Sequence, residues 1–330
     1  MPVLEHSEIS LAPGSAPPAH FPARAGISHG AAGVLIAAVA AIWGVGFIAM
    51  RIALNGGMSV GSLISVRFVL AGLAMFAIVR AKSIPITRRG VIDGIWLGVV
   101  MSFIFWLQTD GMRFTSTAKS GFITGLYVLF TPLVALAAGR RVRLTSLLSA
   151  VLATCGLYLL VHLPGGVLNG WNRGDVETLG CAVLSGIHIV MMDRLTERSE
   201  SWLLAGTQVL TVGVISSAIT AFLPGTSGFR PLATLLIHWP VVAAMLYMAL
   251  FSTVFAFWGQ AVAQTQLGPT ESAVLFCLEP VLAAVLSVVW LKEAMSSSQI
   301  AGGALMVLAM IMAELLPYML RHITVPDTRP

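Results

Sequence analysis

The sequence contains long apolar stretches without a single charged side chain. Residues 231 to 270 hold no Asp, Glu, Lys or Arg, and residues 30 to 50 form an uncharged run long enough to cross a bilayer core as a helix. Only 10% of the 330 residues are charged, 57% are hydrophobic, and the mean hydropathy is +0.89. So few charges cannot coat a soluble protein of this length. The chain is therefore expected to be a polytopic membrane protein, which excludes an ordinary cytosolic enzyme, a nucleic-acid binder and a disordered chain.

Apolar stretches of about 20 residues, bounded by charges, Pro or Gly, predict ten membrane-spanning helices. The predicted spans are 31–52, 58–79, 91–109, 117–138, 144–163, 177–193, 202–223, 241–262, 268–291 and 297–319. A nine-helix count stays open, because the run from 231 to 270 offers only Trp239-Pro240 and residues 264–268 as breaks. Residues 1–29, rich in Pro, Ala, Gly and Ser, are expected to form a disordered cytoplasmic tail, and residues 321–330 a second one.

The basic residues predict the orientation in the membrane. With the N-terminus inside, the cytoplasmic segments hold twelve Lys and Arg, mainly at 80–89 and 140–143, and the opposite segments hold six. Basic residues favour the cytoplasmic side, so both termini are predicted to be cytoplasmic. The three cysteines lie in apolar runs without metal-ligand spacing, so we expect no disulfide framework, no metal site and no cofactor.

A weak repeat relates the two halves of the chain. A Trp and a Gln two residues apart precede a proline inside an apolar run twice, at Trp106, Gln108 and Pro132 and again at Trp258, Gln260 and Pro280. Residues 41–50 align with 183–192, which pairs Gly46 with His188. Because five helices per repeat is an odd number, the second copy would enter the membrane from the opposite side. Inverted repeats around a midplane site are typical of secondary transporters.

Several motifs in order resemble the EamA module of the drug/metabolite transporter superfamily. They are Ile42-Trp-Gly44, Val66-Arg-Phe68, residues 107–127 and Thr131-Pro132, then residues 252–260, Pro269-Thr-Glu-Ser-Ala273, Leu278-Glu-Pro280, Leu291-Lys-Glu293 and Gly302-Gly303. The resemblance covers about residues 31 to 315. It implies an all-α membrane protein with ten transmembrane helices in two inverted five-helix repeats, at 30–163 and 164–320. The sequence departs from the family pattern at Gly139-Arg140-Arg141, where the family often has Gly-Glu-Arg.

Three ionisable residues inside the predicted spans are candidate functional groups, because such residues are costly in lipid and must face the bundle interior. Glu279, before the helix-loosening Pro280, is either a substrate-amine or proton site or a neutral carboxyl in a kinked helix. Arg67 needs a carboxylate, helix-end carbonyls or water, and is interpreted as a structural residue. His188 either reads substrate and shuttles protons or bonds a neighbouring helix.

Amides and aromatic residues complete the predicted substrate site. Gln108 and Gln260 suit recognition of a zwitterion or carbonyl, or join helices. Trp43, Trp106, Trp258 and Tyr127 line a pathway or fill space. The pairs Gly94/Gly98 and Gly121/Gly125 permit close helix contact, either within the chain or at a homodimer seam.

The function expected is a secondary transporter of the bacterial inner membrane that exports amino acids or similar small metabolites by alternating access, and not an enzyme. It would partner with the bilayer and a small metabolite, and with no nucleic acid. An intramembrane serine protease is the alternative, since Gly225-Thr-Ser-Gly228 matches a short protease element. A non-transporting scaffold would leave Glu279, Arg67 and the paired glutamines unexplained.

Overall fold

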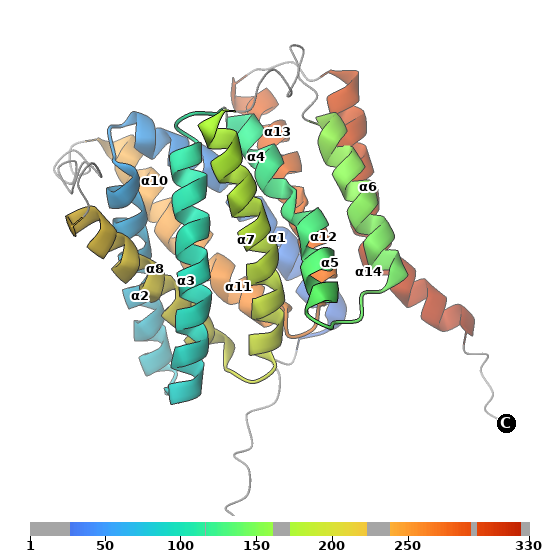
Figure 1. The fold of residues 1–330 in the computed structure, drawn as a ribbon, viewed down its shortest axis with the longest axis horizontal. Helices are drawn as coiled ribbons and strands as arrows, with labels where there is room; N and C mark the ends of the chain where they lie inside the picture. Colours follow the sequence, from blue (N-terminus) through green and yellow to red (C-terminus); the bar gives the residue numbers. More distant parts are fainter. Residues whose placement is uncertain (1–26, 116, 161–171, 223–237, 292–295, 325–330) are drawn as a thin grey trace, which may run out of the picture.

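The computed structural model describes residues 27–115, 117–160, 172–222, 238–291 and 296–324. Every regular element in these ranges is a helix (Figure 1). Six spans are long and apolar enough to cross a membrane, and shorter apolar helices accompany them. The prediction of an all-helical, multi-pass membrane protein is therefore confirmed. Most of the two predicted tails, Glu293 and the segment 225–228 lie outside the described residues.

The helix bounds agree with the predicted spans to within about five residues. The six long spans are α1 (His29–Asn55), α2 (Val60–Ala81), α3 (Arg88–Gly111), α7 (Arg173–Thr196), α8 (Ser201–Phe222) and a continuous rod made of α10 (Trp239–Ala249), the π-helical η1 (Leu250–Phe255) and α11 (Ala256–Ala263). The other helices are α4 (Thr117–Gly125), α5 (Tyr127–Ala137), α6 (Leu144–Leu160), α12 (Pro269–Phe276), α13 (Leu278–Leu291) and α14 (Ser297–Thr324).

Polar residues in the connections determine where the helices begin. Ser28, Ser59 and Thr87 precede α1, α2 and α3, and each side chain accepts a hydrogen bond from the backbone N–H three residues further on. Asn172 precedes α7 and forms a reciprocal capping box with Asp175, at 3.0 and 2.9 Å. Since the caps stand directly before the apolar runs, hydropathy alone located the helices well.

The helices pack into two cores that share α1 and α7. In the first, here named the α2/α8 core, α2 lies along α8 with α3, α10 and the C-terminal half of α1, around buried Phe68 and Met75. In the second, the α6/α14 core, α6 lies along α14 with α5, α12 and the N-terminal half of α1, around Leu157 and Phe276. Figure 1 shows α2 and α8 on one side of the bundle and α6 and α14 on the other, with α7 and α1 between them.

Glycines allow α3 and α8 to approach closely. A Cβ on Gly98 would lie 2.7 Å from the Gln208 carbonyl oxygen and 2.5 Å from Thr211 Cβ, and a Cβ on Gly94 would meet Thr207 at 2.5 Å. Gly94 and Gly98 therefore serve packing within the chain. In the other predicted pair, Gly125 faces Leu157, whereas Gly121 has open space beside it.

Two helices are interrupted just before their prolines. The N–H of Leu126, between α4 and α5, bonds the carbonyl of Ile123 at 3.2 Å, and the N–H of Cys277, between α12 and α13, bonds that of Val274 at 3.0 Å. Both are tightened i to i−3 bonds in place of α-helical ones. Pro280 lacks the N–H that would bond the Phe276 carbonyl, so the second interruption lies where the sequence weakens the helix; Pro132 removes the N–H partner of the Val128 carbonyl, two residues beyond Leu126.

Candidate functional site

A cavity of about 100 Å³ lies between the two cores, which is room for several water molecules or a small solute. Residues from both halves of the chain line it. They are Trp43, Gly46, Phe47, Met50, Arg67, Met101, Ile104, Phe105, Gln108, Thr124, Tyr127, Ser185, His188, Ile189, Ser252, Phe257, Gln260, Phe276 and Glu279. About half of the wall is apolar, mainly aromatic and methionine side chains, and the other half carries polar groups, a mixture that suits a small polar solute.

Glu279 and Tyr127 place a carboxyl and a phenol in this cavity. Glu279 opens α13 directly after the interruption at Cys277, and Tyr127 opens α5 directly after the interruption at Leu126. Both side chains are buried and interact electrostatically. Among the described residues the Tyr127 hydroxyl makes no hydrogen bond of ordinary geometry, and the Glu279 carboxyl is the charged group with which it interacts. Since a buried hydroxyl without a well-formed hydrogen bond is costly, this group is available to a bound solute.

Arg67 enters the cavity from α2 and is held by the π-helical turn. Its Nε donates to Thr253 Oγ1 at 2.7 Å, and its Nη2 donates to the Ser252 carbonyl at 3.1 Å and to Ser252 Oγ at 3.2 Å. The wider turn frees the Ser252 carbonyl, which also accepts the Trp43 indole N–H at 3.1 Å. The guanidinium lies 5.0 Å from the ring centre of Phe105. The predicted acceptors of Arg67 were a carboxylate, helix-end carbonyls or water; the contacts found are one backbone carbonyl and two hydroxyl oxygens, which were not predicted.

The two repeat-related glutamines both line the cavity. Gln260 Nε2 donates to Gln264 Oε1 at 3.0 Å. The Nε2 atom of Gln264 in turn donates to the Ile189 carbonyl at 3.0 Å. Gln260 Oε1 is buried without a partner among the described residues. Gln108 Nε2 reaches Thr124 Oγ1 at 3.5 Å. An acceptor on Gln260 therefore remains for a ligand, while the chain from Gln260 to Ile189 joins α11 to α7.

His188 and Gly46, which the repeat pairs, face the same cavity from α7 and α1. The His188 Nε2 atom lies 2.8 Å from Gln208 Oε1 on α8. This buried contact is the helix-joining alternative for His188, and it still leaves the ring at the cavity wall. Gly46 supplies space instead, because a Cβ there would lie 3.0 Å from Ser252 Oγ.

Trp258, predicted as a substrate-binding residue, lies outside the cavity lining. It stacks on Trp202 with ring centres 5.1 Å apart and an interplanar angle of 25°. The physical reason is helical periodicity: Trp258 precedes Gln260 by two residues, about 200° around the helix, so the two point to different sides. Trp106 likewise points away and donates to Ser216 Oγ at 3.0 Å.

The apolar wall was missed by the sequence analysis. Phe257 and Phe105, each three residues before a cavity glutamine, and Phe276, three residues before Glu279, form an aromatic cluster with Trp43 and Phe68. Their spacing from the polar residues is one helical turn. That periodicity was the available signal, and applying it to each polar residue would have identified all three phenylalanines.

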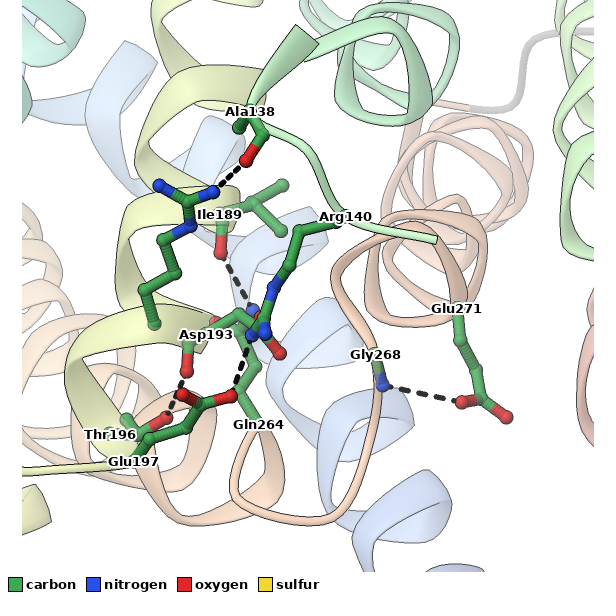
Figure 2. Close-up of polar contacts among 10 residues, drawn as sticks. Ala138, Arg140, Ile189, Asp193, Thr196, Glu197, Gln264, Gly268 and Glu271 are labelled. Carbon is green, nitrogen blue, oxygen red and sulfur yellow. Dashed lines mark hydrogen bonds and ion pairs between the residues drawn. The ribbon is translucent and has the colours of Figure 1, made fainter. Parts of the chain in front are cut away.

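Polar contacts close the end of the bundle at which α1 begins (Figure 2). Arg140, after α5, forms ion pairs with Asp193 and with Glu197 near the end of α7, the latter at 2.8 Å. The pKa of Arg140 is raised by these hydrogen bonds to Glu197 and Asp193. Arg194 donates to the carbonyl of Ala138. Two arginines therefore join the turn after α5 to α7. Arg140 reaches from the turn to α7, and Arg194 reaches from α7 to the turn.

Two further ion pairs join α7 to α3. Arg198 pairs with Asp93 at 2.6 Å at one end, and Arg173 pairs with Asp110 at 2.7 Å at the other. Ser199 Oγ also donates to Asp93 at 2.9 Å. These ion pairs therefore fasten α3 to α7 at both ends of their contact. The described residues contain no group of three or more His, Cys, Asp or Glu arranged to hold a metal ion.

Membrane-spanning helices around a small, buried and partly polar cavity define a transporter. The chain belongs to the EamA-like transporter family, whose model matches residues 31–162 and again 172–314. It is a multi-pass membrane transporter and not an enzyme.

Relatives and a solved structure agree with this membership. The chain is 30% identical over 281 residues to an uncharacterized transporter of Archaeoglobus fulgidus, covering 85% of this chain and 84% of the relative. It is 26% identical over 255 residues to the threonine/homoserine exporter RhtA of Escherichia coli strain K12, covering 77% and 76%. A crystal structure with 20% identity matches with a TM-score of 0.70 over 89% of this chain and 99% of that one, which supports the fold.

Proposed function

We propose that this transporter exports small amino acids or closely similar metabolites and binds them as zwitterions in the central cavity. The similarity to a threonine/homoserine exporter supports the substrate class. The observation that carries the proposal is the set of groups lining one cavity: the Glu279 carboxyl, the Arg67 guanidinium, the Tyr127 hydroxyl and the unpartnered Gln260 carbonyl oxygen.

Each end of an amino acid has a complementary group in this set. Glu279 accepts the ammonium group, and Gln260 Oε1 accepts another of its hydrogens. Arg67, already oriented by Thr253 and Ser252, attracts the carboxylate, to which Tyr127 donates its hydroxyl hydrogen. The side chain would then contact the phenylalanines and methionines of the wall. Trp43, Gln108 and His188 complete the site, whereas Trp258 does not belong to it.

Alternating access would follow from ten crossings in two inverted five-helix repeats, 30–163 and 164–320, with both termini in the cytoplasm of a bacterial inner membrane. The two family matches support the division into repeats. The interruptions at Leu126 and Cys277 also occupy corresponding places, each shortly before a proline. The basic connections 80–89 and 140–143 support the orientation. A reporter fused after residue 150 and one fused after residue 200 test the repeat and orientation.

Export is tested with purified protein in proteoliposomes loaded with labelled threonine, homoserine and larger amino acids. We expect saturable efflux of at least one of these amino acids, slowed by Glu279→Gln and unchanged by Glu271→Gln, a buried carboxylate at the bundle end. Efflux equal to that of empty vesicles for all amino acids, from protein that is monodisperse in detergent, would overturn the proposal.

The protease alternative has no support from the family or the relatives. Its motif at 225–228 lies outside the described residues, and labelling by a serine-directed fluorophosphonate would be its test. A homodimer remains a separate proposal, and size-exclusion chromatography with light scattering tests it. The Gly94/Gly98 pair does not argue for a dimer, because α8 occupies that surface.

A further inference from the structure

The contacts made by Arg140 differ from the other described ion pairs in which parts of the bundle they join. Arg140 follows α5, whose residues Tyr127 and Val128 belong to the α6/α14 core. Its partners Asp193 and Glu197 flank Leu195, which with Met192 belongs to the α2/α8 core. Arg140 therefore joins a helix of the α6/α14 core to the part of α7 that packs in the α2/α8 core, and Figure 2 shows its contacts with Asp193 and Glu197.

The ion pairs between α3 and α7 make no such bridge. Asp93 with Arg198 and Asp110 with Arg173 fasten helices that pack along each other. Both pairs would survive a movement of one core against the other. Of these ion pairs, the Arg140 contacts are the ones that a movement of the end of α5 away from α7 must separate.

The helix that precedes Arg140, α5, begins at a helix interruption that could act as a hinge. α5 is short and begins at the interruption at Leu126, beside the cavity residues Thr124 and Tyr127. Near its middle, the backbone of α5 packs closely against Gly186 of α7. A Cβ on Gly186 would lie 3.1 Å from the N atom of Thr131. Below this contact, the end of α5 is held by Arg140 and by the bond from Arg194 to Ala138.

A second cavity of about 610 Å³ reaches Arg140 from outside. Arg140, Arg141, Arg143, Asp193 and Glu271 are among the residues that line it. It shares no lining residue with the central cavity. Arg140 and Asp193, which form an ion pair, therefore lie in the wall of this second cavity, here named the vestibule. Asp193 lies one helical turn beyond Ile189, which lines the central cavity.

We propose that Arg140 is the latch of the cytoplasmic gate: its ion pairs with Asp193 and Glu197 hold the end of α5 against α7, and their separation connects the vestibule to the central cavity. The proposal rests on the proposed function, which places this end of the bundle in the cytoplasm. Opening requires α5 to swing about Leu126 while α3 and α7 stay together. A solute that contacts Thr124 and Tyr127 would therefore contact the residues on either side of the hinge at Leu126.

The test measures how fast the central cavity can be reached from the cytoplasm. Cys155, Cys181 and Cys277 are replaced by Ala, and Ser185→Cys introduces one thiol into the cavity wall. Inside-out vesicles are treated with a membrane-impermeant maleimide. We expect Arg140→Gln to raise the labelling rate about fivefold, because losing an ion-pair contribution of about 1 kcal/mol shifts the open fraction by that factor.

Matched variants separate a latch from general loosening. Arg198→Gln removes the same charge at the same end of the bundle, and its labelling rate should stay that of the parent. Glu197→Gln removes the exposed acceptor and should raise the rate less than Arg140→Gln, which keeps a test available if the arginine variant does not fold. Arg140→Glu combined with Asp193→Arg should restore slow labelling.

Two results would overturn the proposal. One is parental labelling in folded Arg140→Gln and Glu197→Gln; the other is an equal increase in Arg198→Gln. Labelling needs no substrate, so its outcome is independent of the export assay. A latch without amino-acid efflux would reject the substrate class, and efflux without a change in labelling would reject the latch.

Discussion

The Nε atom of Arg67 in α2 lies 2.7 Å from Thr253 Oγ1 in the π-helical turn. Thr253→Val keeps the shape of the side chain but removes this acceptor from a buried guanidinium, which costs about 1 to 3 kcal/mol. We expect a lower melting temperature in detergent. Thr211→Val is the control, since that hydroxyl bonds the Thr207 carbonyl of its own helix at 2.8 Å. Equal melting temperatures of the two variants would contradict the role given to Thr253.

Tyr127→Phe and Tyr247→Phe should have opposite effects. The Tyr127 hydroxyl makes no hydrogen bond of ordinary geometry among the described residues, so its removal should leave the melting temperature unchanged and raise the KM for efflux about tenfold, equivalent to about 1.4 kcal/mol. The Tyr247 hydroxyl donates to the Ile42 carbonyl at 2.8 Å, so its removal should lower stability. A stability loss in Tyr127→Phe without a change in KM would show that Tyr127 is structural.

Gly98→Ala and Gly121→Ala test the contact between α3 and α8. The new methyl at residue 98 would lie 2.7 Å from the Gln208 carbonyl oxygen, which is backbone and cannot move alone, so we expect reduced folded yield and a lower melting temperature. Gly121 has nothing within 4 Å of the added Cβ, so its variant should be as stable as the parent or more so. Fluorescence-detected size-exclusion chromatography measures both. Equal losses of folded yield and melting temperature in the two variants would contradict the role given to packing between α3 and α8.

Glu279→Gln should remove the dependence of efflux on an imposed pH gradient if this carboxyl exchanges a proton during transport. The glutamine keeps the size and hydrogen-bonding capacity of the side chain but cannot be protonated in the same way. Efflux rates are compared with the interior of the proteoliposomes acidic and alkaline. If efflux of Glu279→Gln still depends on the pH gradient, a group other than Glu279 couples proton movement to transport. Glu271→Gln is the control and should keep the gradient dependence of the parent.

Hydropathy and charge predicted the helices and their bounds, because the bilayer imposes long apolar runs and the caps lie directly outside them. Glu279, Gln260 and His188 were predicted as cavity residues on one argument, that polar groups within a span must face the interior. Trp258 was predicted from its proximity to Gln260 in sequence, without helical periodicity, and it lies outside the lining of the central cavity. The Arg140 contacts could not be predicted, because they join residues 53 and 57 positions apart through a tertiary approach.

The π-helical turn at Leu250–Phe255 determines in which direction the side chains of α11, the helix that follows it in the rod, point. A wide turn takes up one more residue than an α-helical turn, and each residue advances the helix by about 100°. Phe257 and Gln260 face the solute with this extra rotation included. Deleting one residue from the turn would shorten the rod by about 1.5 Å, yet would swing Gln260 out of register with its neighbours and remove the carbonyl that holds Arg67.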